Sequence, residues 1–379
     1  MLILTNTNSA YAAKALAGAL LMGAQAAISA APVAATAPAA PPTEAPAADD
    51  EGFMDRQAKS PWLLVPLVSS SPKLGSSVGV LAGYVTRMDD ASSPSMLAVQ
   101  GTKSNTQSQV LGVGGKLYFN QNRDRLFAAV GMGNAHNDYQ DFNGSGQRVV
   151  SEDKLHSAFV RYMHQVAPGW YLGAQGIRAN YEVNGEDPDS QNVLDQAGIV
   201  GVTSAGLGLM VMFDDRDNVS NPRQGMVAQL HNLAYRASLG GDSDYDVVSG
   251  DVRTYHPMSP EQVLAVHAHV RLAWDAPGSR QSSVDMRGYT QGQYLGRHAV
   301  SVELEDRYMF RPQWGAKAFA GLTCLFGDGQ SCDAEHLYPM GGAGVFYVIK
   351  PKENMLVSAE FAQGKSGNRG FYLRFGHPF

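Results

Sequence analysis

The sequence LAVHAHVRLAWD, residues 264–275, changes character at nearly every position. Its even-numbered positions are apolar and comprise Leu264, Val266, Ala268, Val270, Leu272 and Trp274. Its odd-numbered positions include His267, His269, Arg271 and Asp275. A repeat of two residues places alternate side chains on opposite faces of a β-strand. The segment therefore predicts a strand with one apolar face and one polar face.

The same alternation recurs from residue 60 onward, where no helical repeat of 3.6 residues persists. The runs predict strands at 61–68, 75–86, 95–103, 107–119, 125–135, 154–164, 169–181, 203–214, 225–236, 245–256, 262–275, 298–309, 314–326, 339–349, 354–362 and 370–379. A soluble sandwich would bury the apolar faces, whereas a membrane barrel turns them toward lipid. Most runs have about 9–12 residues, a length that suits a tilted strand crossing a bilayer. We expect an all-β fold, a transmembrane antiparallel β-barrel with sixteen strands.

The connections between these runs alternate in length. Those after odd-numbered strands are long at 136–153, 182–202, 276–297 and 327–338. Those after even-numbered strands are mostly short, as in NQNRD, QVAPG and KPKEN. Bacterial outer-membrane barrels have this pattern, with short periplasmic turns and long loops outside the cell. We therefore expect the protein in the bacterial outer membrane, surrounded by its lipid.

The first 59 of the 379 residues have a different composition. Residues 1–30 contain a short run rich in apolar and small residues after Lys14, which predicts a signal peptide; a short anchor helix is the alternative. Residues 31–59 are rich in Ala and Pro and predict an extended linker in the periplasm. The barrel would then occupy residues 60–379. The net charge of −6 and the lack of a basic block argue against a nucleic-acid partner.

Two further local features concern the end of the chain. Cys324 and Cys332 flank a short segment, and they predict either a disulfide in an oxidising compartment or two free thiols. Phe375 and Phe379 belong to the last predicted strand, which ends on an aromatic residue. Such an ending is similar to the sorting signal of bacterial outer-membrane barrels; an ordinary aromatic strand end is the alternative.

Two motifs interrupt the alternation. The first is DDRDNVSNPRQG, which begins at Asp214 and ends at Gly225, and the second is MRGY, which begins at Met286. In this order and spacing they resemble the BamA/TamA/FhaC-type outer-membrane assembly superfamily, also called the bacterial surface antigen family. The resemblance covers the predicted barrel, and the MRGY motif is followed by a strand that carries Glu303, Glu305 and Arg307.

The resemblance implies that the loop with Arg287 folds back into the barrel and that its guanidinium meets acidic side chains on the inner wall. The residues agree, because Glu303 and Glu305 lie on the polar face of the strand at 298–309. A buried arginine needs a carboxylate partner, and we favour Glu305 over Glu303. Gly288 would allow a turn or a close approach to the wall, and Tyr289 would pack with its hydroxyl bonded. A solvated loop arginine is the alternative.

The superfamily also implies a second acidic anchor on a later strand, at a position that Gly321 occupies here. We expect Asp328 to substitute for it from the end of the loop. In the first motif, Asp214 and Arg216 are expected to pair or to cap the periplasmic rim. The turn itself would be shaped by its polar, proline and glycine residues, namely Asn218, Pro222 and Gly225.

The histidines and serines belong to no catalytic motif, so we expect no enzyme activity and no cofactor. His267 and His269 stand at alternate positions of one strand and could share a metal ion. The sequence marks no third ligand for that ion, so we expect no metal site.

For function, the resemblance implies a role in outer-membrane biogenesis, namely insertion or translocation of a protein or lipid client. Superfamily members that insert or secrete proteins carry periplasmic POTRA domains, for which residues 31–59 are too few. A separate periplasmic partner would then supply the POTRA-like function. Pro61, Pro66 and Pro72 predict a weak seam between the first and last strands. A passive channel or porin for small solutes is the alternative, and a surface enzyme comes third.

Overall fold

A computed structural model describes residues 60–71, 75–377 and 379. The predicted signal peptide at residues 1–30 and the predicted linker at 31–59 lie outside the described residues, as do Pro72 and Pro378. Among the described residues, no helix has the length and apolar composition of a membrane-spanning helix.

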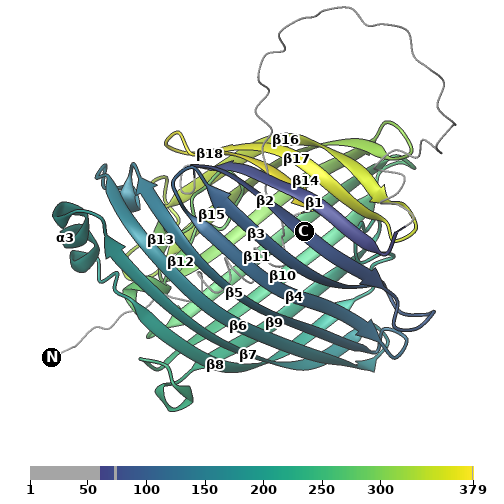
Figure 1. Ribbon diagram of the computed structural model, residues 1–379, viewed down its shortest axis with the longest axis horizontal. Helices are drawn as coiled ribbons and strands as arrows, with labels where there is room; N and C mark the ends of the chain where they lie inside the picture. Colours follow the sequence, from purple (N-terminus) through teal and green to yellow (C-terminus); the bar gives the residue numbers. More distant parts are fainter. Residues whose placement is uncertain (1–59, 72–74, 378) are drawn as a thin grey trace, which may run out of the picture.

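The described residues form a closed antiparallel barrel of sixteen strands (Figure 1). The barrel strands are β1 (Trp62–Ser71), β2 (Gly75–Thr86), β3 (Ser95–Ser104), β4 (Gln109–Phe119), β5 (Asp124–Tyr139), β6 (Val149–Ala167), β7 (Trp170–Gly185), β8 (Val202–Asp214), β9 (Gly225–Tyr235), β10 (Tyr245–Pro257), β11 (Gln262–Trp274), β14 (His298–Met309), β15 (Trp314–Phe326), β16 (Leu337–Lys350), β17 (Met355–Gly364) and β18 (Arg369–Phe375). Neighbours in sequence pair with one another, and β18 returns to β1. The predicted fold class and strand number are confirmed.

The remaining elements lie in the connections. They are η1 (Phe142–Gly144), α3 (Pro188–Gln196), η2 (Ala237–Leu239), η3 (Gly278–Arg280), β12 (Ser282–Ser283) and β13 (Leu295–Gly296). β12 and β13 pair only with each other, within the connection between β11 and β14. We call the barrel end that carries this connection and α3 the long-loop end, and the opposite end the short-loop end.

The alternation read from the sequence separates the outside of the barrel from its interior. On β8, Leu207 and Leu209 are exposed, whereas Gly208 between them is partly buried and Met210 is buried. On β14, Glu303 and Glu305 are buried while the apolar residues between and beside them are exposed. An apolar outer face and a polar lumen are what a lipid-embedded barrel requires.

Aromatic pairs mark the short-loop end of the outer surface. Three pairs join neighbouring strands there: Trp62 with Tyr84, Trp170 with Phe213 and Trp314 with Tyr347, with ring centroids 4.8 to 5.2 Å apart. In each pair the tryptophan is the first residue of its strand, and its partner lies near the end of the neighbouring strand. Aromatic girdles at the membrane interface are a feature of transmembrane barrels.

The structure corrects the predicted bounds of three strands, β5, β6 and β18. β5 and β6 continue beyond residue 135 and before residue 154, because Tyr139 pairs with Val149 and both side chains are buried in one apolar cluster. Half of the predicted loop at 136–153 is therefore strand, and only residues 140–148 connect β5 to β6. The last strand ends at Phe375 rather than at residue 379, and Gly376 turns the chain with a φ of +85°.

The tail after β18 enters the barrel. The side chain of Phe379 is buried against Tyr255, Val263 and Ala265. The carbonyl oxygen of Phe379 accepts a hydrogen bond of 2.7 Å from Arg307. Phe375 is the last residue of β18, whereas Phe379 lies beyond the strand, so its expected place at the end of the last strand is wrong. The sorting signal itself stays a prediction.

We predict that a charge on the outer face costs more than the same charge on a loop. Leu209→Lys should lower the free energy of unfolding in phospholipid vesicles by about 2–4 kcal/mol if the position lies near the bilayer midplane, because the ammonium must enter hydrocarbon. Leu239→Lys is the control, since Leu239 is 41% exposed in η2, whereas Leu209 is 70% exposed on β8. Equal costs in denaturant titrations would contradict a lipid-facing β8.

Candidate functional site

The connection between β11 and β14 folds into the barrel instead of extending into solvent. Its base is the β12–β13 hairpin, which aligns Ser282 with Gly296 and Ser283 with Leu295. Between the two strands of this hairpin, the loop carries apolar side chains that are buried against the wall formed by β14 to β18: Val284, Met286, Tyr289 and Tyr294. Burial of these side chains stabilises the infolded position of the loop. We call residues 275–297 the inner loop.

Arg287 stands at the tip of the inner loop and meets three carboxylates. One terminal nitrogen donates to Glu305 at 2.6 Å and to Glu360 at 2.9 Å, and the other donates to Glu303. The guanidinium carbon lies 3.3 Å from the ring centroid of Phe319. The arginine is therefore held by charge-assisted hydrogen bonds on its edge and by an aromatic ring on its face.

Other cations surround the same carboxylates, so that no member of the cluster is buried alone. Arg307 lies 2.8 Å from Glu305, and Lys317 lies 2.5 Å from Glu360. Arg374 of β18 is 3.6 Å from Glu360. The cluster joins the inner loop to β14, β15, β17 and β18. We call these residues, Arg287, Glu303, Glu305, Arg307, Lys317, Glu360 and Arg374, the charge cluster.

Gly288 and Tyr289 fix the loop backbone beside Arg287. Gly288 has a φ of +87°, and an added Cβ would lie 3.1 to 3.2 Å from the backbone of β17, so glycine suits both the conformation and the space. Its N–H donates to the hydroxyl of Tyr372 on β18 at 2.7 Å. The Tyr289 hydroxyl donates to the carbonyl of Pro339 at 2.6 Å and accepts from the N–H of Lys365 at 2.8 Å. Burial raises the pKa of Tyr289 to about 12, so this hydroxyl keeps its proton at neutral pH.

The structure brings Met286, Arg287, Gly288 and Tyr289 together with Glu303 and Glu305, but it does not bring Asp328 to them. Asp328 lies 3.1 Å from Arg297 and is 45% exposed, so its expected role as a partner of Arg287 is wrong. The methyl group of Met286 fills the space beside Gly321, where a larger side chain would displace it. The further carboxylate comes instead from Glu360. The sequence does carry a signal for Glu360. It is a charged residue at a lumen-facing position of a strand whose neighbouring residues are mostly small.

The turn between β8 and β9 has its own buried ion pair. Arg216 donates to both oxygens of Asp214, at 2.8 and 2.9 Å, and Arg125 of β5 donates to the same carboxylate at 2.5 Å. Two guanidinium groups on one carboxylate tie the turn to the inner wall. The carboxylate oxygen of Asp214 is therefore shared between two elements that lie far apart in sequence.

The rest of this turn has the expected loop chemistry. The Asn218 side chain accepts from the N–H groups of Ser220 and Asn221 at 2.8 and 2.9 Å, which forms an Asx-type turn. Pro222 is buried, and Gly225 has a φ of +91° with no room for a Cβ beside the Asp215 carbonyl. The turn also reaches the tail, because the side-chain amide oxygen of Asn221 lies 3.1 Å from a ring nitrogen of His377.

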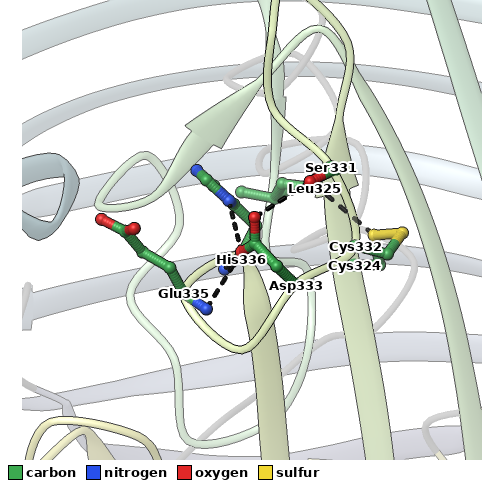
Figure 2. The surroundings of a disulfide bond; sticks show 7 residues. All are labelled: Cys324, Leu325, Ser331, Cys332, Asp333, Glu335 and His336. Atoms are coloured by element: carbon green, nitrogen blue, oxygen red, sulfur yellow. Dashed lines mark hydrogen bonds and ion pairs between the residues drawn. A yellow bond between two sulfur atoms is a disulfide. The ribbon is translucent and has the colours of Figure 1, made fainter.

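Cys324 and Cys332 form a disulfide at the long-loop end, with Cα atoms 5.5 Å apart (Figure 2). Just beyond it, the Asp333 carboxylate accepts from the N–H groups of Glu335 and His336 at 3.1 Å. The same carboxylate lies 2.9 Å from a ring nitrogen of His336, and this contact lowers the pKa of Asp333 to about 2. The disulfide and the Asp333 turn together order the connection between β15 and β16.

These features define a transmembrane β-barrel whose lumen is occupied by one of its own loops. No protein-family model and no curated protein sequence matches the chain. Among solved structures, the fold is similar to that of BamA from Haemophilus ducreyi lacking POTRA domains 1–3. That match has a TM-score of 0.51 and 14% sequence identity, and it covers 84% of this chain and 70% of that chain.

The fold is also similar to two structures of CdiB. CdiB from Acinetobacter baumannii matches with a TM-score of 0.56 and 12% identity, over 83% of this chain and 59% of that chain. CdiB from Escherichia coli matches with a TM-score of 0.56 and 13% identity, over 84% and 62%. The chain thus spans less than two thirds of the length of either CdiB. The described residues have the barrel fold of BamA and CdiB, which confirms the predicted resemblance at the level of the fold.

We predict that Arg287→Ala lowers the free energy of unfolding by about 3–5 kcal/mol, because three carboxylates lose their shared buried partner. Arg297→Ala is the control within the same loop; its partly exposed pair with Asp328 should contribute only about 0–1 kcal/mol. Guanidinium titration in detergent micelles and protease cleavage within residues 275–297 measure the effect. The same stability and cleavage for the Arg287 and Arg297 variants would contradict a lock at Arg287.

A second prediction separates Glu360 from Asp328. Glu360→Gln should release the inner loop to protease, because Lys317, Arg374 and Arg287 all lose a buried carboxylate. Asp328→Asn should leave the cleavage rate of the inner loop unchanged, since Asp328 contacts only the exposed side of the loop. A larger effect at Asp328 would restore the expectation drawn from the sequence.

Proposed function

We propose that the protein takes part in outer-membrane biogenesis, where it aids the insertion or translocation of a protein or lipid client through an opening between β1 and β18. The single observation that carries the proposal is the joining of an infolded loop to a short barrel seam.

The seam has few backbone pairs. β1 and β18 share two aligned Cα pairs, Ser69 with Tyr372 and Ser70 with Phe371. On its other side, β1 pairs with β2 over its whole length, from Trp62 to Ser71. Pro66 contributes no N–H to any ladder. Parting β1 from β18 therefore breaks far fewer hydrogen bonds than parting β1 from β2.

Apolar contacts close the rest of the seam. Leu63, Val65 and Leu67 of β1 are buried in a cluster with Ile349 of β16, and partly buried Leu373 and Phe375 of β18 pack against it. Such contacts are not directional, so they can be replaced by the apolar surface of a client or by lipid tails. This part of the seam supports reversible opening within a membrane.

The inner loop is connected to the seam through one residue. Gly288 donates to the hydroxyl of Tyr372, and the backbone of Tyr372 is one of the two positions paired with β1. Arg374, two residues further along β18, belongs to the charge cluster. We infer that the locked loop holds β18 in place, while β1 is the strand that moves.

The lumen supports this role better than free diffusion of solutes. The inner loop, the charge cluster and the tail at His377 and Phe379 occupy the interior on the side of β10 to β18. A client would arrive from the short-loop end, which we place in the periplasm. A periplasmic partner with POTRA-like domains would deliver it, as inferred from the BamA and CdiB fold.

The test crosslinks the seam. Ser70→Cys with Phe371→Cys joins β1 to β18, and Ser70→Cys with Ser76→Cys joins β1 to β2 as the matched control. Both are made with Cys324→Ser and Cys332→Ser to avoid exchange with the native disulfide. In liposomes, the unlinked proteins should accelerate the folding of an unfolded outer-membrane barrel client, measured by heat-modifiable gel migration.

The expected result is that the seam crosslink abolishes the acceleration, that a reductant restores it, and that the control crosslink has no effect. Equal activity of both crosslinked proteins would refute the moving seam. A steady ion-selective conductance in planar bilayers, without any effect on client folding, would support a passive channel instead.

A further inference from the structure

Three side chains of metal-ligand type meet on the inner wall of the barrel, next to the charge cluster but outside it. They are Asp251 of β10 and His267 and His269 of β11, and their ligand atoms lie within 4.8 Å of one another. Asp251 is buried and both histidines are partly buried. Among the described residues, this is the one group of three or more such side chains with this spacing.

Strand register explains why the three meet. His267 and His269 are two positions apart, so both point to the inner face of β11. Asp251 is the Cα partner of His269 on the neighbouring strand, which places its carboxylate between the two rings. One carboxylate oxygen lies 2.6 Å from Nε2 of His267 and 3.6 Å from Nδ1 of His269. The sequence could not mark this third ligand, because only the pairing of β10 with β11 brings it near.

We propose that Asp251, His267 and His269 form a binding site for one divalent transition-metal ion of the Zn²⁺ type. Two imidazole nitrogens and one carboxylate oxygen are a three-ligand set found in open zinc sites, where a water molecule takes the fourth position. Mg²⁺ and Ca²⁺ prefer sets made of oxygen atoms alone. The proposal is independent of the function proposed above.

One neighbouring charge also acts on the site. Arg253 lies 2.9 Å from the other oxygen of Asp251 and forms an ion pair with it. Its positive charge also opposes every cation equally. Binding therefore depends on the imidazole nitrogens, which favour Zn²⁺ and its neighbours in the transition series over Mg²⁺ and Ca²⁺.

The site adjoins two features described above. His267 is the Cα partner of Glu303, one of the carboxylates that hold Arg287. The ring of Phe379 lies 4.9 Å from the ring of His267. An ion bound here would fix the strand pair β10–β11 where it meets the tail and the inner loop. It would also replace the proton that His267 and Asp251 otherwise share.

The test measures zinc on the full-length protein, purified in detergent without a polyhistidine tag and stripped with a chelator. After equilibration with Zn²⁺ and gel filtration, elemental analysis should find one equivalent of zinc on the wild type. Titration of Co²⁺ should produce the visible absorption of a low-coordinate site. Asp251→Asn and the double variant His267→Gln/His269→Gln should bind more than about tenfold more weakly, since loss of even an outer-sphere partner has an effect of that size.

His256→Gln is the matched control, because His256 is an exposed histidine of β10 that contacts Thr254 and lies outside the cluster. It should keep one equivalent of zinc. Heat-modifiable migration confirms that each variant is folded before the titration. Wild-type protein that binds no zinc, or variants that bind as tightly as the wild type, would overturn the proposal and leave a hydrogen-bonded His–Asp pair. Tighter binding of Mg²⁺ than of Zn²⁺ would also overturn it.

Discussion

The guanidinium of Arg287 is buried inside a barrel wall, and much of the interior follows from the need to balance its charge. A buried ion costs several kcal/mol unless it is paired and fully hydrogen-bonded. Glu303, Glu305 and Glu360 supply the balance, but three carboxylates need more than one cation. Arg307, Lys317 and Arg374 provide the remaining positive charge. Side chains from four strands of the wall therefore hold the tip of one loop. Such a cluster specifies one position for the inner loop more strongly than apolar packing alone would.

The barrel could be predicted from the sequence because the alternation of apolar and polar residues along a strand is a local property. The faces of β11 and β14 can be read within a dozen residues, and the pairing of Arg287 with Glu303 and Glu305 involves positions separated by 16 and 18 residues. Glu360 is 73 residues from Arg287, and it becomes a neighbour only when the strands close into a cylinder. The sequence did not predict that Asp251 lies near the two histidines, because its place beside His269 depends on the register between two strands. The inward turn of the tail after Phe375 likewise depends on space inside the lumen.

The wall is not equally firm around its circumference. β14 to β18 are joined by long ladders and by the charge cluster, and β18 is held further through Tyr372. β1 lies next to this firm region, yet it shares only two backbone pairs with it. The buried charges of the cluster are therefore concentrated on one side of the seam. In the opening proposed above, movement of β1 and β2 would leave the buried charges undisturbed.

The connections at the two ends of the barrel are held by different contacts, and these contacts limit which strands can move. At the long-loop end, a disulfide and backbone turns hold the connection between β15 and β16. At the short-loop end, the β8–β9 turn is fixed by Asp214 to β5, and through Asn221 it meets His377 of the tail. The tail follows directly from β18 and ends against Arg307, which also contacts Glu305. Any displacement of β18 would thus pull the tail away from the charge cluster and from the β8–β9 turn. Because displacement of β1 breaks none of these contacts, the opening proposed above would move β1 rather than β18.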